Sequence, residues 1–298
     1  MVASAGNTAR AFAKVCSKNN IPLLLSIPLD NINALWFKKP LNDCVKIIAS
    51  PAGSDYFDAI ALSDIACKSP RFMAEGGAKN VARRDGMGTT LLSAVEVIGR
   101  IPDAYFQAIG SGTGTIAAWE NNLRLIEDGR YGTHKMKLYP SQNDPFTIMY
   151  DSWKTHSRAL VPMTPEEARE AASIIDAKVL SNRKPPYPIA GGLYDALEDA
   201  GGDIFKVTNA ELHIWKDKFA QLEGIDIHNA AAVAVASLAQ AAAEGIIRPD
   251  EVIMLNITGA GEELAKSEGE VFYATPNLVL DPLSKEEEII TQVENLFK

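Results

Sequence analysis

Five residues that include three glycines have the composition of a backbone loop that binds an anion: Gly110, Ser111, Gly112, Thr113 and Gly114. They follow an apolar stretch, Tyr105 to Ile109, that is expected to be a strand, and they precede a helix expected to begin at Thr115. Glycines at alternate positions let backbone amides approach a ligand, and the positive end of the following helix attracts negative charge. The loop therefore predicts a phosphate site. The alternative is a glycine-rich turn without a ligand.

Two familiar nucleotide motifs are incomplete in this loop. Position 115 is Thr, where Gly-x-Gly-x-x-Gly needs its third glycine, and no Gly-Lys-Ser/Thr follows for a P-loop. A nicotinamide-dependent oxidoreductase is thereby disfavoured, whereas a generic phosphate cradle is still compatible with the sequence.

A second candidate loop lies near the start of the chain: Ser4, Ala5, Gly6, Asn7 and Thr8. It leads into a predicted helix with Phe12 and Cys16 on one face. A loop of this kind points amides at the N-terminus of a helix and suits a carboxylate. The alternative is an ordinary helix-capping turn with Asn7 or Thr8 as the cap.

Thr258 lies in a third candidate loop, which runs from Asn256 to Gly261 after an apolar strand, Val252 to Leu255. In α/β sheets ligands gather beyond the carboxyl ends of the strands, so Thr258 and the glycine loop are expected to face one crevice. The alternative is a strand-ending turn in which the glycines supply positive φ.

The composition restricts the class of protein and the kind of partner. The chain has 298 residues, 47% of them hydrophobic, and a formal net charge of -9. This length favours two lobes or one large α/β domain. The negative charge argues against nucleic acid or an anionic membrane as a partner. No stretch reaches the roughly twenty apolar residues of a membrane span.

Cysteine and histidine usage indicates neither disulfides nor a metal site. Cys16, Cys44 and Cys67 include no Cys-x-x-Cys pair and read as reduced thiols of a cytoplasmic protein. The four histidines show no metal-ligand spacing.

Alternating strands and helices are predicted to position the three loops. Short continuous apolar runs are typical of strands buried on both faces of a parallel sheet, and they span residues 21–28, 45–49, 135–138, 203–207 and 252–257. Ser54 is expected to cap a helix that reaches about Lys68. The Ala-rich segment 230–243 is predicted to be a buried helix. Capping boxes are expected for Thr164 with Glu167, Thr208 with Glu211 and Ser284 with Glu287.

The three loops together resemble those of the fold-type-II pyridoxal-phosphate enzymes, the family of tryptophan synthase β and threonine synthase. In that family an Ala-Ser-Ala-Gly-Asn-Thr loop binds the substrate carboxylate, a Gly-Ser-Gly-Thr-Gly loop holds the cofactor phosphate, and a Ser or Thr faces the pyridine nitrogen. The resemblance implies that residues 4–8 bind substrate and that Asn7 contacts the phenolic oxygen of pyridoxal 5′-phosphate. It also implies that residues 110–114 and Thr258 bind the rest of the cofactor.

The resemblance also implies the fold, which is α/β with two lobes, each a parallel sheet with flanking helices. Residues 1–78 are expected to be the remainder of a smaller, mobile lobe and residues 79–298 the larger lobe. The segment 80–89 is similar to the segment that returns to the larger lobe in the family. Asp85 and Gly88 stand where threonine synthases usually have Glu and Lys.

The family's Schiff-base lysine lies a short distance upstream of the Ser-Ala-Gly-Asn loop, whereas this chain begins three residues before Ser4. We therefore expect an N-terminally truncated family member that lacks the catalytic lysine. Lys14 and Lys18 follow the loop and are assigned no such role.

Within the family, the loops are most similar to those of cysteate synthase of methanogenic archaea. This likeness implies that O-phospho-L-serine and sulfite give L-cysteate and phosphate, for coenzyme M biosynthesis. Threonine synthase, which uses O-phosphohomoserine and water, is an alternative, as is an inactive fragment that only binds phosphate or the cofactor. A homo-oligomer is expected. Candidate contacts for anions, or else solvated surface charges, are Arg10, Arg83, Arg84 and Lys38.

Overall fold

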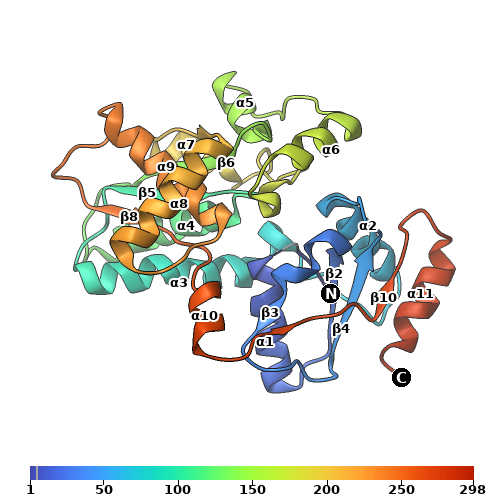
Figure 1. Cartoon of the computed structure of the whole chain (residues 1–298). Helices are drawn as coiled ribbons and strands as arrows, with labels where there is room; N and C mark the ends of the chain where they lie inside the picture. The colour runs from blue at the N-terminus through green and yellow to red at the C-terminus, as the bar shows by residue number, and fades with distance from the viewer. Residues whose placement is uncertain (5) are drawn as a thin grey trace. The chain divides into compact units, whose positions relative to one another are not determined.

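The computed structural model describes residues 1–4 and 6–298, and its tertiary contacts divide the chain into two compact units (Figure 1). Unit 1 comprises Met1–Glu75 and Glu262–Lys298, and unit 2 comprises Gly76–Gly261. The first boundary lies close to the expected one at residue 78. The expectation that residues 79–298 form one lobe differs from the structure at its C-terminal end, because the chain from Glu262 onwards belongs to unit 1.

A parallel sheet in the order β1-β2-β4-β10 forms the centre of unit 1. Its strands are β1 (Val2–Ala3), β2 (Leu23–Pro28), β4 (Val45–Ser50) and β10 (Leu278–Val279). All six residues of β2 are buried, as predicted for a strand covered on both faces. Leu25 and Ile27 pack against α1 (Asn7–Asn19), and Leu24 packs on the opposite face.

The C-terminal segment joins unit 1 through this sheet. Strand β10 pairs with β4, placing Leu278 beside Ile48, and α11 (Glu286–Asn295) packs against α2 (Tyr56–Ala66). These contacts explain the departure from the expected lobe, because a strand of two residues carries no periodicity in the sequence. Unit 1 also contains α10 (Glu262–Glu268), a 3-10 turn (Leu29–Ala34) and an antiparallel pair, β3 (Trp36–Phe37) with β9 (Phe272–Tyr273).

The sheet of unit 2 is also parallel, in the order β7-β6-β5-β8. Its strands are β5 (Ala104–Ala108), β6 (Lys137–Asn143), β7 (Phe205–Val207) and β8 (Ile253–Leu255). Strands β7 and β8 fall inside the predicted runs, whereas β6 extends beyond the predicted 135–138. In this order β5 lies between β6 and β8. The glycine loop follows the carboxyl end of β5.

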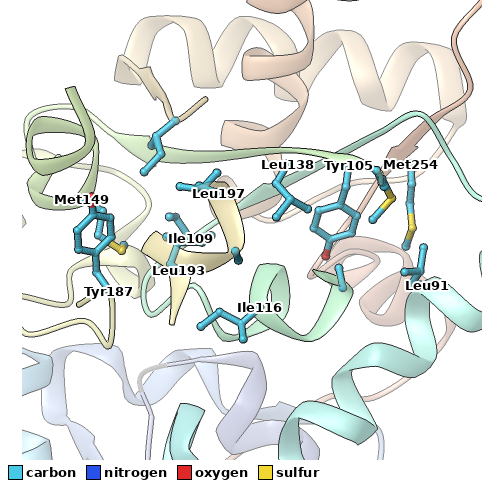
Figure 2. Close-up of a cluster of buried hydrophobic side chains, with 14 of the residues drawn as sticks. Leu91, Tyr105, Ile109, Ile116, Leu138, Met149, Tyr187, Leu193, Leu197 and Met254 are labelled. Atoms are coloured by element: carbon cyan, nitrogen blue, oxygen red, sulfur yellow. The ribbon is translucent and has the colours of Figure 1, made fainter. Parts of the chain in front are cut away.

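Helices cover both faces of this sheet (Figure 1). They are α3 (Val81–Ile98), α4 (Thr113–Asp128), α5 (Ile148–Lys154), α6 (Pro165–Ile174), α7 (Leu193–Ala200), α8 (Asn209–Glu223) and α9 (Asn229–Ala243), with 3-10 turns at Gly77–Lys79 and Lys178–Leu180. Tyr105 and Ile109 share a buried cluster with side chains of α3, α4 and α7 (Figure 2). Phe106 faces the other way and packs with Ala241 of α9, which is the predicted buried Ala-rich helix.

Two of the predicted capping boxes are confirmed. Thr164 and Thr208 each accept a hydrogen bond from the amide of the Glu three residues later, and the carboxylate of that Glu accepts one from the backbone amide of the Thr. The prediction for Ser284 is wrong, because Lys285 is the N-cap of α11 and gives no side-chain bond. The Ser284 amide instead closes a turn onto the Asp281 carbonyl.

The predicted cap at Ser54 is also wrong. Asp55 caps α2 and forms the reciprocal box with Asp58, a shorter carboxylate than the Glu or Gln of the usual pattern. At α1 the N-cap is Gly6, and neither Asn7 nor Thr8 takes that place.

Candidate functional site

The glycine loop changes from strand to helix over four residues. Strand β5 ends at Ala108, and α4 begins at Thr113 rather than at the predicted Thr115. Gly112 is the N-cap, with φ of 77°, a left-handed conformation that favours glycine. The first turn of α4 therefore lies just beyond the carboxyl end of β5, as the sequence predicted.

The first turn of α4 presents amides that the described chain does not satisfy. Its first helical bond runs from the Ile116 amide to the Gly112 carbonyl (3.0 Å), the N-cap Gly112 gives no side-chain bond, and the Thr113 amide donates to Ser111 Oγ (3.4 Å). The amides of Gly114 and Thr115 have no acceptor among residues 1–4 and 6–298. No acidic residue lies in this turn. Unsatisfied amides at the positive end of a helix form a binding site for an anion.

Close packing requires glycine at alternate positions of this loop. A Cβ at Gly110 would lie 3.1 Å from the Val179 carbonyl oxygen, and one at Gly112 would lie 3.2 Å from the Leu193 side chain. A Cβ at Gly114 would lie 2.4 Å from Oε1 of Gln107. At these three positions the loop is packed closely against its surroundings.

Thr115 is a candidate residue that the sequence analysis missed. Its side chain is fully buried, and its Oγ1 has no partner among the described residues. A buried hydroxyl is ordinarily hydrogen-bonded, so an orphan next to unsatisfied amides points to an external acceptor. The signal in the sequence was the hydroxyl directly after the last glycine.

We expect the substitution Thr115→Val to separate binding from stability. The isosteric valine removes the orphaned hydroxyl, so inorganic phosphate should bind about 2- to 10-fold more weakly, the effect of one hydrogen bond. The melting temperature should stay equal or rise, because no buried polar group is left unpaired. Calorimetric titration and a thermal melt measure the two quantities, and unchanged phosphate affinity would exclude Thr115 from the anion site.

Thr258 lies at the same edge of the unit 2 sheet as the glycine loop. Strand β8 ends at Leu255 and pairs in parallel with β5, so the loops that follow both strands leave from neighbouring carboxyl ends. A bridge between Ile227 and Ala260 anchors the Thr258 loop, together with a bond from the His228 amide to the Gly259 carbonyl (2.9 Å). The structure thus brings together two of the three predicted loops within one unit.

The N-terminal loop is built within unit 1. Ser4 Oγ lies 3.4 Å from the Gly6 amide and 3.3 Å from the Ala9 amide, both of which donate to it. Ala5 lies outside the described residues. Asn7 and Thr8 occupy the first turn of α1, half-buried, with no acidic residue in that turn. The Ser4 hydroxyl therefore supports the start of α1.

Arg10 holds the side chain of Asn7. Its Nη1 donates to Asn7 Oδ1 (3.1 Å), and its Nε donates to the Trp36 carbonyl (3.0 Å). The guanidinium carbon lies 3.4 Å from the centroid of the Trp36 ring, a cation–π contact. Burial lowers the pKa of Arg10, with a smaller opposing effect from Glu262, and the group remains charged. The side-chain oxygen of Asn7, Oδ1, is therefore held toward Arg10.

Two of the other candidate anion contacts already have anionic partners. Arg84 bonds both carboxylate oxygens of Glu120 through Nε, at 3.0 and 2.9 Å. Lys38 lies 2.7 Å from Glu268. Among the described residues, no group of His, Cys, Asp and Glu could hold a metal ion, and no helix is both long and apolar enough to cross a membrane.

Comparison with known proteins identifies the family. The family model described as pyridoxal-phosphate dependent enzyme matches residues 1–259. The chain belongs to this family. Its cofactor is pyridoxal phosphate, and the residues of the glycine loop fit a phosphate, because two amides and one buried hydroxyl there have no acceptor or partner within the described chain.

Two relatives share a name. Cysteate synthase of Methanosarcina mazei is 43% identical over 281 residues, which cover 94% of this chain and 68% of the relative. Cysteate synthase of Methanocella paludicola is 46% identical over 281 residues, covering 93% of this chain and 65% of the relative. The chain thus spans about two thirds of the length of these relatives.

Solved structures confirm the predicted fold class. Maize serine racemase matches with a TM-score of 0.64 at 14% identity, covering 90% of this chain and 75% of the racemase. Serine racemase from Dictyostelium discoideum matches with a TM-score of 0.60 at 14% identity, covering 87% of this chain and 74% of that racemase. At these identities the likeness concerns the fold, that of the fold-type-II enzymes.

Proposed function

We propose that the protein catalyses the reaction of a cysteate synthase, in which sulfite replaces the phosphate of O-phospho-L-serine. The observation that carries this proposal is the pair of amides in the first turn of α4 that have no acceptor among the described residues, next to the Thr258 loop, in a chain 43% identical to a cysteate synthase. The phosphate-binding loop alone fits many enzymes of the family. The names of the relatives favour this particular replacement over others.

The proposal assigns a task to each candidate site residue. The loop from Gly110 to Gly114, joined by the amide and hydroxyl of Thr115, would hold the cofactor phosphate. The Thr258 hydroxyl would face the pyridine nitrogen, and because a hydroxyl is neutral, it leaves that nitrogen unprotonated. Asn7 would contact the phenolic oxygen, and the rest of the loop from Ser4 to Thr8, including Ala5 and Gly6, would bind the substrate carboxylate.

Pyridoxal phosphate, when bound, supplies an electron sink for the bonds at the α-carbon of the substrate. An unprotonated pyridine nitrogen makes that sink weaker, which suits loss and replacement of a group on the β-carbon. No lysine of the printed sequence is assigned a catalytic role. We also propose that the protein is cytoplasmic, in keeping with its three free thiols. The homo-oligomer expected from the sequence is part of the same proposal.

The test is a product assay on the protein loaded with pyridoxal phosphate. With O-phospho-L-serine and sulfite, we expect equimolar release of phosphate and L-cysteate, and no phosphate release when either substrate is omitted. Threonine from O-phosphohomoserine, without cysteate, would make the protein a threonine synthase. Cofactor binding without turnover of either substrate would make it a binding module.

A further inference from the structure

A chain of three polar side chains crosses the interior of unit 2 behind the candidate site. Asn256 Nδ2 donates to the Tyr105 hydroxyl (2.7 Å), and that hydroxyl donates to Gln107 Oε1 (2.5 Å). Tyr105 is fully buried in an apolar cluster (Figure 2), and Gln107 is 6% exposed. Polar groups in such surroundings are costly unless they are paired. We call these three residues the buried relay.

The direction of the bonds in the buried relay follows from the chemistry of its middle member. A phenol has one proton, and burial raises the pKa of Tyr105, so the group stays neutral. It donates that proton to Gln107, whose Oε1 only accepts, and it accepts from Asn256 in turn. The three side chains therefore form one ordered unit.

The two ends of the buried relay support the two loops of the site. Gln107 packs directly beneath Gly114, because a Cβ there would lie 2.4 Å from its Oε1 and 2.5 Å from its Nε2. Asn256 stands two positions before Thr258, and its amide bonds the Phe106 carbonyl (2.9 Å). Shifting either loop would strain the bond at the other end.

We propose that Asn256, Tyr105 and Gln107 are positioning residues that set the separation between the phosphate cradle and the Thr258 hydroxyl. This role rests on the proposed function, in which one ligand touches both loops. A ligand that spans two binding groups gains from the second contact only when their spacing matches its own length. The affinity of a ligand that touches only one loop does not depend on this spacing.

Three probes distinguish spacing from ordinary support of a loop. Pyridoxine 5′-phosphate reaches both loops and carries no aldehyde, so it cannot bond covalently to a lysine. Pyridoxine carries only the ring, and inorganic phosphate only the anion. In the variant Tyr105→Phe we expect pyridoxine 5′-phosphate to bind about 10-fold more weakly, while the affinities of the other two stay within about twofold.

Tyr139→Phe is the matched control. Tyr139 lies on the neighbouring strand, is 4% exposed and stacks on Phe106, and its hydroxyl bonds to none of the described residues. This variant should bind all three probes as the wild type does. Asn256→Ala, which removes the other donor of the buried relay, should repeat the selective loss and serves if Tyr105→Phe folds poorly.

The outcomes separate the buried relay from the proposed function. If the variant loses equal affinity for phosphate and for pyridoxine 5′-phosphate, the buried relay only supports the phosphate loop locally. If the variant loses no affinity for any probe, the buried relay has no role in binding. Either result overturns the inference but leaves the cofactor site intact. Failure of the wild-type protein to bind pyridoxine 5′-phosphate would overturn both.

Discussion

Replacing Gly114 with alanine is expected to weaken binding of pyridoxal phosphate about 10- to 100-fold. The new Cβ would lie 2.4 Å from Gln107 Oε1 and 2.9 Å from its Cδ. Gln107 is buried and bonded to Tyr105, so it cannot swing aside without breaking that bond. The alternative is a shift of the first turn of α4, which moves its amides. Overpacking of this kind costs about 1–3 kcal/mol, and each 1.4 kcal/mol is about tenfold in affinity.

Gly86→Ala provides the matched control for this substitution. Gly86 also lies in a helix, and a Cβ there would meet nothing within 4 Å. Alanine is the better helix former, so this variant should be as stable as the wild type or more so, by up to about 1 kcal/mol. Fluorescence titration with the cofactor and thermal melts compare the two variants. Wild-type affinity in Gly114→Ala would mean that the first turn of α4 does not hold the phosphate.

The sequence predicted those parts of the fold whose causes are local. The six buried residues of β2 are apolar except for Ser26, and Thr164 and Thr208 have their capping partners three residues away. The same reasoning failed at α2, where an adjacent residue competed for the N-cap position. Asp55 displaced Ser54 as the cap because its carboxylate accepts from two amides, those of Phe57 and Asp58.

Parts that depend on distant residues were not predictable. The bond between Asn256 and Tyr105 joins residues 151 positions apart, and no pattern in either segment indicates it. The pairing of β10 with β4 depends on two residues of each strand. Thr115 was missed because only the structure shows that its hydroxyl has no partner among the described residues. The glycine loop and Thr258 could be selected as candidates because glycine spacing and strand ends are visible in the sequence.

Replacing Arg10 with methionine is the second change expected to have a large effect. Methionine keeps an apolar stem over Trp36 but loses the bond to Asn7 Oδ1 and the bond to the Trp36 carbonyl. With Oδ1 turned toward Arg10, the other side of the Asn7 amide carries the Nδ2 donor, which is the group that a phenolic oxygen needs. Without Arg10 the amide can rotate. Hydrogen bonds to charged groups contribute about 1.5–3 kcal/mol, so cofactor affinity should fall about 10- to 100-fold.

Two further variants define what Arg10 contributes. Arg10→Lys keeps the charge but not the planar group that stacks on Trp36 while bonding Asn7, so lysine should fail to restore affinity. Lys14→Met removes an exposed charge one turn further along α1 and should bind the cofactor normally. Titration with pyridoxal phosphate, monitored by its absorption maximum, also reports the surroundings of the phenolic oxygen. If Arg10→Lys binds as the wild type does, charge alone is sufficient, and Arg10 does not orient Asn7.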